Sequence, residues 1–187
     1  GRGGWGEVGG GGGRCGAGRA KRVGTCTGIG RGGAHLSVEK RHKVESGLKM
    51  YNVKATAESF SDSNFQRFDA VTCLEMLEHV PNPASVVKAC ASMTKPGGTL
   101  FFSTINRNPK SYLFAIIGVE YVLKMLPKGT HDFSKFIKPS ELTSWIRDAS
   151  LELQDITGLL YNPITKNYKL SQNDVDVNYM ISVTKPL

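Results

Sequence analysis

The chain has 187 residues, 40% of them hydrophobic, and a formal net charge of +8, which suits one domain with one hydrophobic core. The charge is uneven, because residues 1–50 carry 10 of the 24 Lys and Arg but only 3 of the 16 Asp and Glu. The remaining residues are nearly neutral, which argues against a folded nucleic-acid-binding face. The sequence contains no run of 18 apolar residues and no signal-peptide pattern, so we expect a soluble or peripheral protein.

Residues 1–33 differ from the rest of the chain, since they hold 16 of its 22 glycines. They include two Arg-Gly-Gly triplets and few large apolar side chains, a composition typical of disordered or RNA-binding low-complexity sequence. Residues 3–6 lack apolar bulk and are a poor candidate for a buried strand. The five glycines at 9–13 leave room for close approach of the backbone to a ligand, at a cost in conformational entropy.

Beyond this leader the pattern becomes that of an ordinary α/β protein. Residues 36–47 predict an amphipathic helix that ends at a glycine. Residues 50–54 predict a short strand, residues 56–60 a loop, and residues 62–66 a polar connection.

The middle of the chain predicts a strand–helix–strand unit. Residues 70–74 are apolar and β-branched enough for a buried strand. A helix begins at Asn82-Pro83, and a Lys-Pro-Gly-Gly turn at 95–98 separates it from a second buried strand at 99–104. The apolar face of the helix is formed by Val86, Val87, Cys90 and Met93.

The cysteines show no CxxC or other paired spacing. Cys73 falls in the first predicted strand of this unit and Cys90 on the apolar face of its helix. We therefore expect buried free thiols and a reducing compartment.

The last third of the chain predicts two helices and several strands. Residues 111–126 are apolar with helical spacing but too short to span a bilayer; a core or lid helix and a helix lying on a membrane surface both fit. Residues 139–149 predict a second helix. The strands expected at 151–158, 167–170 and 177–183 would close the sheet antiparallel, with a turn at 161–163.

Several strings resemble one enzyme family. Residues 68–80 (FDAVTCLEMLEHV), the KPGG turn and residues 101–108 (FFSTINRN) are similar to class I S-adenosylmethionine-dependent methyltransferases. Residues 127–139 (PKGTHDFSKFIKP), 156–165 (ITGLLYNPIT) and 176–180 (DVNYM) narrow the resemblance to the O-methyltransferases of ubiquinone biosynthesis. The resemblance covers the chain from about Thr56 to its C-terminus.

The resemblance implies an α/β, Rossmann-like class I methyltransferase fold, with a mostly parallel, doubly wound sheet and an antiparallel last strand. It divides the chain into a glycine-rich, degenerate and poorly ordered cofactor-loop region at 1–33 and a methyltransferase domain at 34–187. Residues 109–133 would form a lid or a membrane-docking segment within that domain.

The resemblance also implies S-adenosylmethionine as cofactor. The glycine run that includes Gly9 and Gly11 lies where the family has its acidic-x-G-x-G-x-G loop. Gly30 is 21 positions after Gly9, where roughly 20 residues separate the loop from an acid that binds the ribose. Glycine has no acceptor for those hydroxyls, so this part of the cofactor site is degenerate. Leu74 matches a family position whose backbone contacts the cofactor.

Three residues after the first strand of the central unit suit acid–base or metal chemistry. A phenol loses its proton near pKa 10, so methylation of a phenolic oxygen benefits from a base or a metal. Glu75, Glu78 and His79 have the i, i+3, i+4 spacing of one helical face, and two carboxylates with an imidazole could bind a divalent ion. Glu78 and His79 could instead only cap the following loop.

The resemblance implies that Glu75, Glu78 and His79 bind a magnesium-type ion. Glu75 and His79 are also the candidate catalytic residues, and His131 is the second candidate base because the family places its segment near the substrate.

The activity implied is O-methylation of a polyprenylated catechol, a phenol or quinol intermediate of ubiquinone biosynthesis, by a protein bound peripherally to a membrane. We expect other ubiquinone-biosynthesis proteins as partners and no nucleic acid. The expected location is the bacterial cytoplasm at the inner membrane, or the matrix face of that membrane in mitochondria. Two alternatives remain: a catalytically impaired methyltransferase-like protein, suggested by Gly30 and the weak first strand, and an RNA-binding protein acting through its leader.

Overall fold

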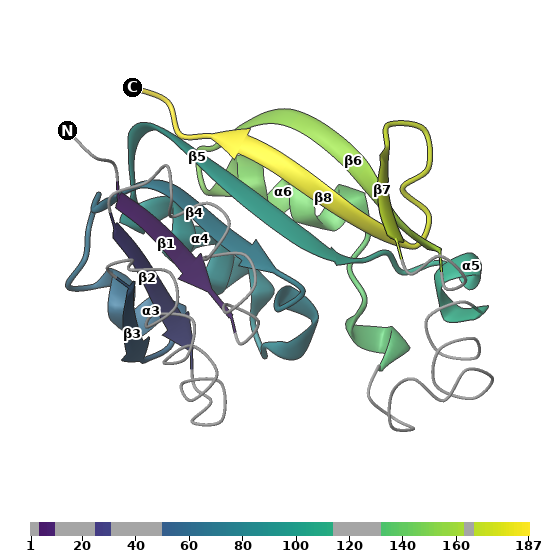
Figure 1. Ribbon diagram of the computed structural model, residues 1–187, viewed down its shortest axis with the longest axis horizontal. Helices are drawn as coiled ribbons and strands as arrows, with labels where there is room; N and C mark the ends of the chain where they lie inside the picture. The colour runs from purple at the N-terminus through teal and green to yellow at the C-terminus, as the bar shows by residue number, and fades with distance from the viewer. Residues whose placement is uncertain (1–3, 10–24, 31–49, 114–131, 163–166) are drawn as a thin grey trace.

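The computed structural model of the protein describes residues 4–9, 25–30, 50–113, 132–162 and 167–187 (Figure 1). These residues form one eight-stranded sheet in the order β3-β2-β1-β4-β5-β8-β6-β7. The strands are β1 (Gly4–Val8), β2 (Thr25–Gly30), β3 (Met50–Lys54), β4 (Phe68–Leu74), β5 (Thr94–Ile105), β6 (Glu152–Asn162), β7 (Asn167–Ser171) and β8 (Asn178–Thr184).

The strand directions confirm the expected fold class. Strands β3, β2, β1, β4 and β5 pair in parallel, whereas β8 is antiparallel to β5 and to β6, and β6 is antiparallel to β7. The parallel half places the carboxyl ends of its strands at one edge, which is where open α/β sheets bind ligands.

Among the described residues, the helices α3 (Ala57–Ser61), α4 (Pro83–Met93) and α6 (Pro139–Asp148) cover one face of the sheet (Figure 1). The short elements are η1 (Leu77–His79), α5 (Pro109–Ser111) and η3 (Phe133–Lys135). Because side chains alternate along a strand, every second residue of β4, β5 and β8 packs toward α4 and α6. The core includes Val71, Cys73, Leu100, Phe102, Tyr179, Ile181, Val87, Cys90, Leu142 and Ile146, all of them nearly inaccessible to solvent.

The first strand is well paired, contrary to the expectation that residues 3–6 would be a poor strand. β1 lies between β2 and β4 and pairs with both. A Cβ atom on Gly6 would lie 2.9 Å from the ring of Phe68, so that ring occupies the space that a larger side chain would need. Trp5 stacks on Phe101 with ring centroids 6.4 Å apart, and its indole donates to the Thr72 hydroxyl at 3.4 Å. Neighbouring strands therefore supply the apolar bulk that β1 lacks.

The predicted loop at 56–60 is wrong, because most of it is helix α3. Thr56 caps this helix: its hydroxyl accepts from the Ser59 N–H at 3.1 Å, and the Ser59 hydroxyl accepts from the Thr56 N–H at 3.2 Å. This reciprocal pair is a capping box. Burial of Ala57 and Phe60 then fixes the helix against the core.

Two predicted turns also differ. Residues 95–98 form an irregularity inside β5, where the pairing with β4 jumps from Phe68–Thr94 to Ala70–Thr99. Gly97 has a φ of +74° there, a conformation that glycine adopts without steric cost. At the other site β6 continues to Asn162, so 161 and 162 are strand residues.

The helix predicted at 139–149 is confirmed as α6. The helix predicted at 36–47 and most of the one predicted at 111–126 lie outside the described residues. Within the described ranges, no helix is long and apolar enough to cross a bilayer.

Candidate functional site

The carboxyl ends of β1, β2 and β4 bring three of the predicted cofactor residues to one edge of the sheet. Gly9 follows β1 with a φ of +126°, and its N–H donates to the Ile29 carbonyl at 3.0 Å. Gly30 ends β2, and a Cβ atom placed on it would lie 3.5 Å from the Gly9 carbonyl oxygen. Leu74 ends β4, the other neighbour of β1. Gly11 and His131 lie outside the described residues.

The backbone at Gly9 favours glycine. Residues with side chains rarely adopt so positive a φ, and a Cβ atom added there would lie 3.3 Å from the side chain of Met76. At Gly30 the nearest atoms to an added Cβ belong to the Gly9 backbone at ordinary contact distance. The position that lacks the acidic side chain therefore has room for a Cβ atom.

Glu75 lies directly after β4 and is held from two other strands. It has a φ of +49°, which is uncommon for a residue other than glycine. Its N–H donates to the Ser103 carbonyl at 3.0 Å and lies 3.1 Å from the Ser103 hydroxyl. That hydroxyl donates to Glu75 Oε1 at 2.7 Å, and Asn178 Nδ2 donates to Glu75 Oε2 at 3.2 Å.

Glu78 is held differently, inside the short helix η1. The side chain is 3% exposed, and its Oε2 accepts a 2.8 Å hydrogen bond from the Thr104 hydroxyl. Ser103 and Thr104 are consecutive residues of β5, so their side chains point to opposite faces of the sheet. The carboxylates of Glu75 and Glu78 are therefore anchored on opposite sides of β5.

His79 ends η1 and faces solvent, since its side chain is 52% exposed. Its Nε2 lies 4.0 Å from Glu78 Oε1, too far for a hydrogen bond but close enough for an attraction when the ring is protonated. Among the candidate bases in the described residues, His79 is an imidazole with access to solvent.

The three implied metal ligands do not form a ligand set in this arrangement. The expectation of one helical face is wrong, because Glu75 precedes η1 and has left-handed backbone geometry. The described residues contain no group of three or more His, Cys, Asp or Glu side chains placed to hold a metal ion. Glu78 Oε2 accepts from the Thr104 hydroxyl, whereas Glu75 Oε1 accepts from the Ser103 hydroxyl.

Sequence reasoning missed Ser103, Thr104 and Asn178. The signal available was the consecutive Ser-Thr pair at the end of an otherwise apolar strand, because a buried hydroxyl needs a hydrogen-bond partner. That pattern does not say which partner, and Asn178 is 103 residues from the glutamate it contacts.

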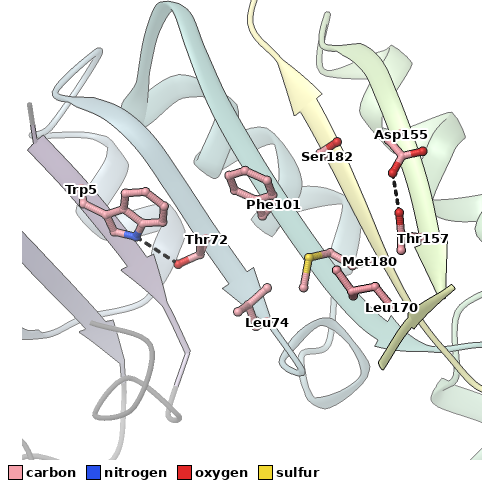
Figure 2. Close-up of a pocket in the computed structure, with 9 residues that line it drawn as sticks. All are labelled: Trp5, Thr72, Leu74, Phe101, Asp155, Thr157, Leu170, Met180 and Ser182. Atoms are coloured by element: carbon pink, nitrogen blue, oxygen red, sulfur yellow. Dashed lines mark hydrogen bonds between the residues drawn. The ribbon is translucent and has the colours of Figure 1, made fainter. Parts of the chain in front are cut away.

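A cavity of about 270 Å³ lies beside this edge, on the sheet face opposite to α4 and α6 (Figure 2). It is lined by Trp5, Thr72, Leu74, Phe101, Asp155, Thr157, Leu170, Met180 and Ser182. Leu74 is the lining residue shared with the carboxyl edge. The cavity is mostly apolar and its lining includes neither Glu75 nor His79.

The cysteines of the described residues are free and buried, as expected for Cys26, Cys73 and Cys90. A hydrogen bond with Cys90, together with burial, raises the pKa of the Cys73 thiol well above its usual value. A thiol in this state is a poor nucleophile, so Cys73 contributes packing to the end of β4.

Comparison with known proteins identifies the family. A family model described as a methyltransferase domain matches residues 7–156. The ubiquinone biosynthesis O-methyltransferase of Saccharophagus degradans is 60% identical over 166 residues, covering 89% of this chain and 70% of that protein. The protein of the same name from Pseudomonas entomophila is 60% identical over 179 residues, covering 96% of this chain and 77% of that protein.

Solved structures agree on the fold. A methyltransferase from Bacillus halodurans superposes with a TM-score of 0.70 at 21% identity, covering 100% of this chain and 94% of that one. An S-adenosylmethionine-dependent methyltransferase from Methanosarcina mazei gives a TM-score of 0.71 at 19% identity, with coverage of 100% and 93%. With the sheet order and the sequence matches, this shows that the chain belongs to the class I S-adenosylmethionine-dependent methyltransferases, within the family of the ubiquinone biosynthesis O-methyltransferases.

Proposed function

We propose that the protein transfers a methyl group from S-adenosylmethionine to a phenolic oxygen of a polyprenylated catechol in ubiquinone biosynthesis. The observation that carries the proposal is the carboxyl edge of the sheet, where Gly9, Gly30 and Leu74 lie beside Glu75. The 60% identity to relatives with this named activity supports the choice of substrate.

The cofactor supplies an electrophilic methyl group on a sulfonium, and the protein must align the acceptor oxygen with it. Gly9 and the residues at the end of β4 would hold the cofactor at this edge of the sheet. Gly30 would offer no carboxylate to the ribose hydroxyls.

The acceptor hydroxyl becomes a better nucleophile as its proton leaves. In our proposal, Glu75 accepts a hydrogen bond from the catechol and orients it, and His79 takes the proton as the new O–CH₃ bond forms and the S–CH₃ bond breaks. A neutral imidazole can act as a general base. His131 stays a second candidate base by resemblance.

A divalent ion remains an implication of the resemblance. Because Glu75 and Glu78 hydrogen-bond on opposite sides of β5, no step of the mechanism is assigned to it.

The direct test is methyl transfer to a short-chain prenylated catechol with methyl-labelled S-adenosylmethionine. We expect labelled methyl ether from the native protein and a rate at least about 10²-fold lower from His79→Gln, the usual scale for loss of a general base. Lys88→Gln is a matched control, since Lys88 is an exposed residue of α4. Equal rates for His79→Gln and the control would remove His79 from the mechanism.

We also propose that residues 109–133 dock on a membrane, where a polyprenylated substrate resides. Tyr112 and Leu113 support this, because they are 45% and 54% exposed. Lys110, in contrast, is paired with Asp174 and Asp176. Hydrogen bonds to these carboxylates raise the pKa of Lys110, and the bond to Asp176 has the larger effect. Lys110 is therefore less available to anionic lipid than its position in the sequence suggests.

Docking of this kind places the protein at the cytoplasmic face of a bacterial inner membrane, or at the matrix face in a mitochondrion, with access to other ubiquinone-biosynthesis proteins. Co-sedimentation with anionic vesicles tests it: Leu113→Glu should weaken binding, while Leu170→Glu, a change of an exposed leucine on β7, should not. Equal loss in both variants would contradict docking through this segment.

A further inference from the structure

The backbone at Glu75 is held in an unfavourable conformation by one residue of the neighbouring strand. A non-glycine residue with a φ of +49° persists only where its surroundings compensate for the strain. Here the Glu75 N–H donates to the Ser103 carbonyl at 3.0 Å, and the Ser103 hydroxyl lies 3.1 Å from the same nitrogen. Ser103 is 2% exposed, so water does not compete effectively for these contacts.

The side chain of Glu75 is fixed by two donors, one for each carboxylate oxygen. Ser103 Oγ donates to Oε1 at 2.7 Å and Asn178 Nδ2 donates to Oε2 at 3.2 Å. Ser103 belongs to β5 and Asn178 begins β8, and these strands are directly paired. Because the two donors come from adjacent strands, the carboxylate has one preferred orientation relative to the sheet.

The hydroxyl of Thr104, the residue after Ser103, does not belong to this arrangement. Thr104 donates to Glu78 on the other face of β5, so it does not orient Glu75. A carboxylate has about four acceptor positions, so the hydrogen bonds from Ser103 and Asn178 do not by themselves occupy all of them.

We propose that Ser103 and Asn178 are positioning residues, which act through Glu75 to orient its carboxylate toward the acceptor hydroxyl. The inference rests on the proposed function, in which Glu75 contacts the substrate. The two residues contribute no proton and no bond to the reaction; they restrict where the accepting oxygens lie.

The test is a set of double-mutant cycles. Ser103→Ala and Asn178→Ala should each lower kcat for catechol methylation by about 10-fold, the loss expected when one hydrogen bond to a charged group is removed. Binding of S-adenosylhomocysteine should stay unchanged. In a Glu75→Gln background the same substitutions should have little further effect, because residues that act through one group are not additive. Asn178→Gln, which keeps an amide donor, should recover part of the rate.

The control is Ser182→Ala, which removes a hydroxyl from the face of β8 that lines the cavity (Figure 2). It should leave kcat unchanged. Full additivity of Ser103→Ala and Asn178→Ala with Glu75→Gln would overturn the proposal, since it would show a role independent of Glu75. Native-like kcat in both alanine variants would overturn it too.

Crystal structures of the native protein and of the Ser103→Ala, Asn178→Ala double variant test the positioning role independently of methyl transfer. We expect the Glu75 carboxylate to leave its position in the double variant while β4, β5 and β8 stay in place. An unmoved carboxylate would refute the positioning role, whatever the activity. Absence of methylation by the native protein, with a carboxylate that moves, would refute the proposed function alone.

Discussion

Replacing Gly30 by aspartate should add a cofactor contact that glycine at this position cannot make. Gly30 ends β2 beside Gly9, and an added Cβ atom would lie 3.5 Å from the Gly9 carbonyl oxygen and 3.8 Å from its carbon. Both are ordinary contact distances, so the substitution should not force the strands apart. The new carboxylate would be at the edge where the ribose of S-adenosylmethionine is expected.

The expected gain follows from the hydrogen bonds that the carboxylate can accept. A hydrogen bond to a charged group contributes about 1.5–3 kcal/mol, part of which is offset by desolvation of the carboxylate. We therefore expect S-adenosylhomocysteine to bind about 10- to 100-fold more tightly to Gly30→Asp, since 1.4 kcal/mol corresponds to a factor of ten. Isothermal titration calorimetry of the two proteins in the same buffer measures the difference.

Gly30→Ala is the matched control. It has the same Cβ atom and the same loss of backbone freedom in the unfolded chain, a stabilisation of about 0.4–1 kcal/mol, but it has no acceptor. Tighter binding to Gly30→Asp than to Gly30→Ala would assign the gain to the carboxylate. Equal affinities in all three proteins would refute the inference that position 30 lies beside the ribose.

Three further predictions concern stability and metal dependence. Tyr179→Phe should cost about 1 kcal/mol, because the buried hydroxyl donates to the Ile137 carbonyl at 2.9 Å. Burial raises the pKa of Tyr179. Its contribution to the free energy of unfolding is therefore complete below the unfolded-state pKa of about 10 and is lost as the pH rises above that value. Urea unfolding of both proteins at neutral and alkaline pH should show that Tyr179→Phe loses less stability at alkaline pH than the native protein. Lys185→Met should destabilise the fold by about 1–2 kcal/mol, since its Nζ donates to two carbonyls at the C-terminal end of α4 at 2.8 and 2.9 Å; an unchanged unfolding midpoint would contradict this. The resemblance predicts that excess chelator stops methyl transfer and that Glu75→Gln weakens the response to added magnesium. Full activity in excess chelator would contradict metal binding and leave only an acid–base role for these residues.

The sequence determined the central strand–helix–strand unit and the helix α6. Each of these carries its signal locally, as an apolar run, a 3.6-residue period or a capping residue next to its helix. The polar residues after β4 were identifiable as site candidates for the same reason, because their place at the end of a buried run follows from the sequence alone. The class of fold was predicted from the family resemblance.

The tertiary structure decided which of those residues act together. β1 is a strand because Phe68 and the neighbouring strands fill the space beside its glycines, a contact between segments more than 60 residues apart. The spacing of Glu75 and Glu78 suggested one helical face, but the left-handed backbone at Glu75 places their carboxylates on opposite sides of β5. A local pattern records the period of a segment, whereas the orientation of a side chain at the end of a strand depends on hydrogen bonds from strands distant in the sequence.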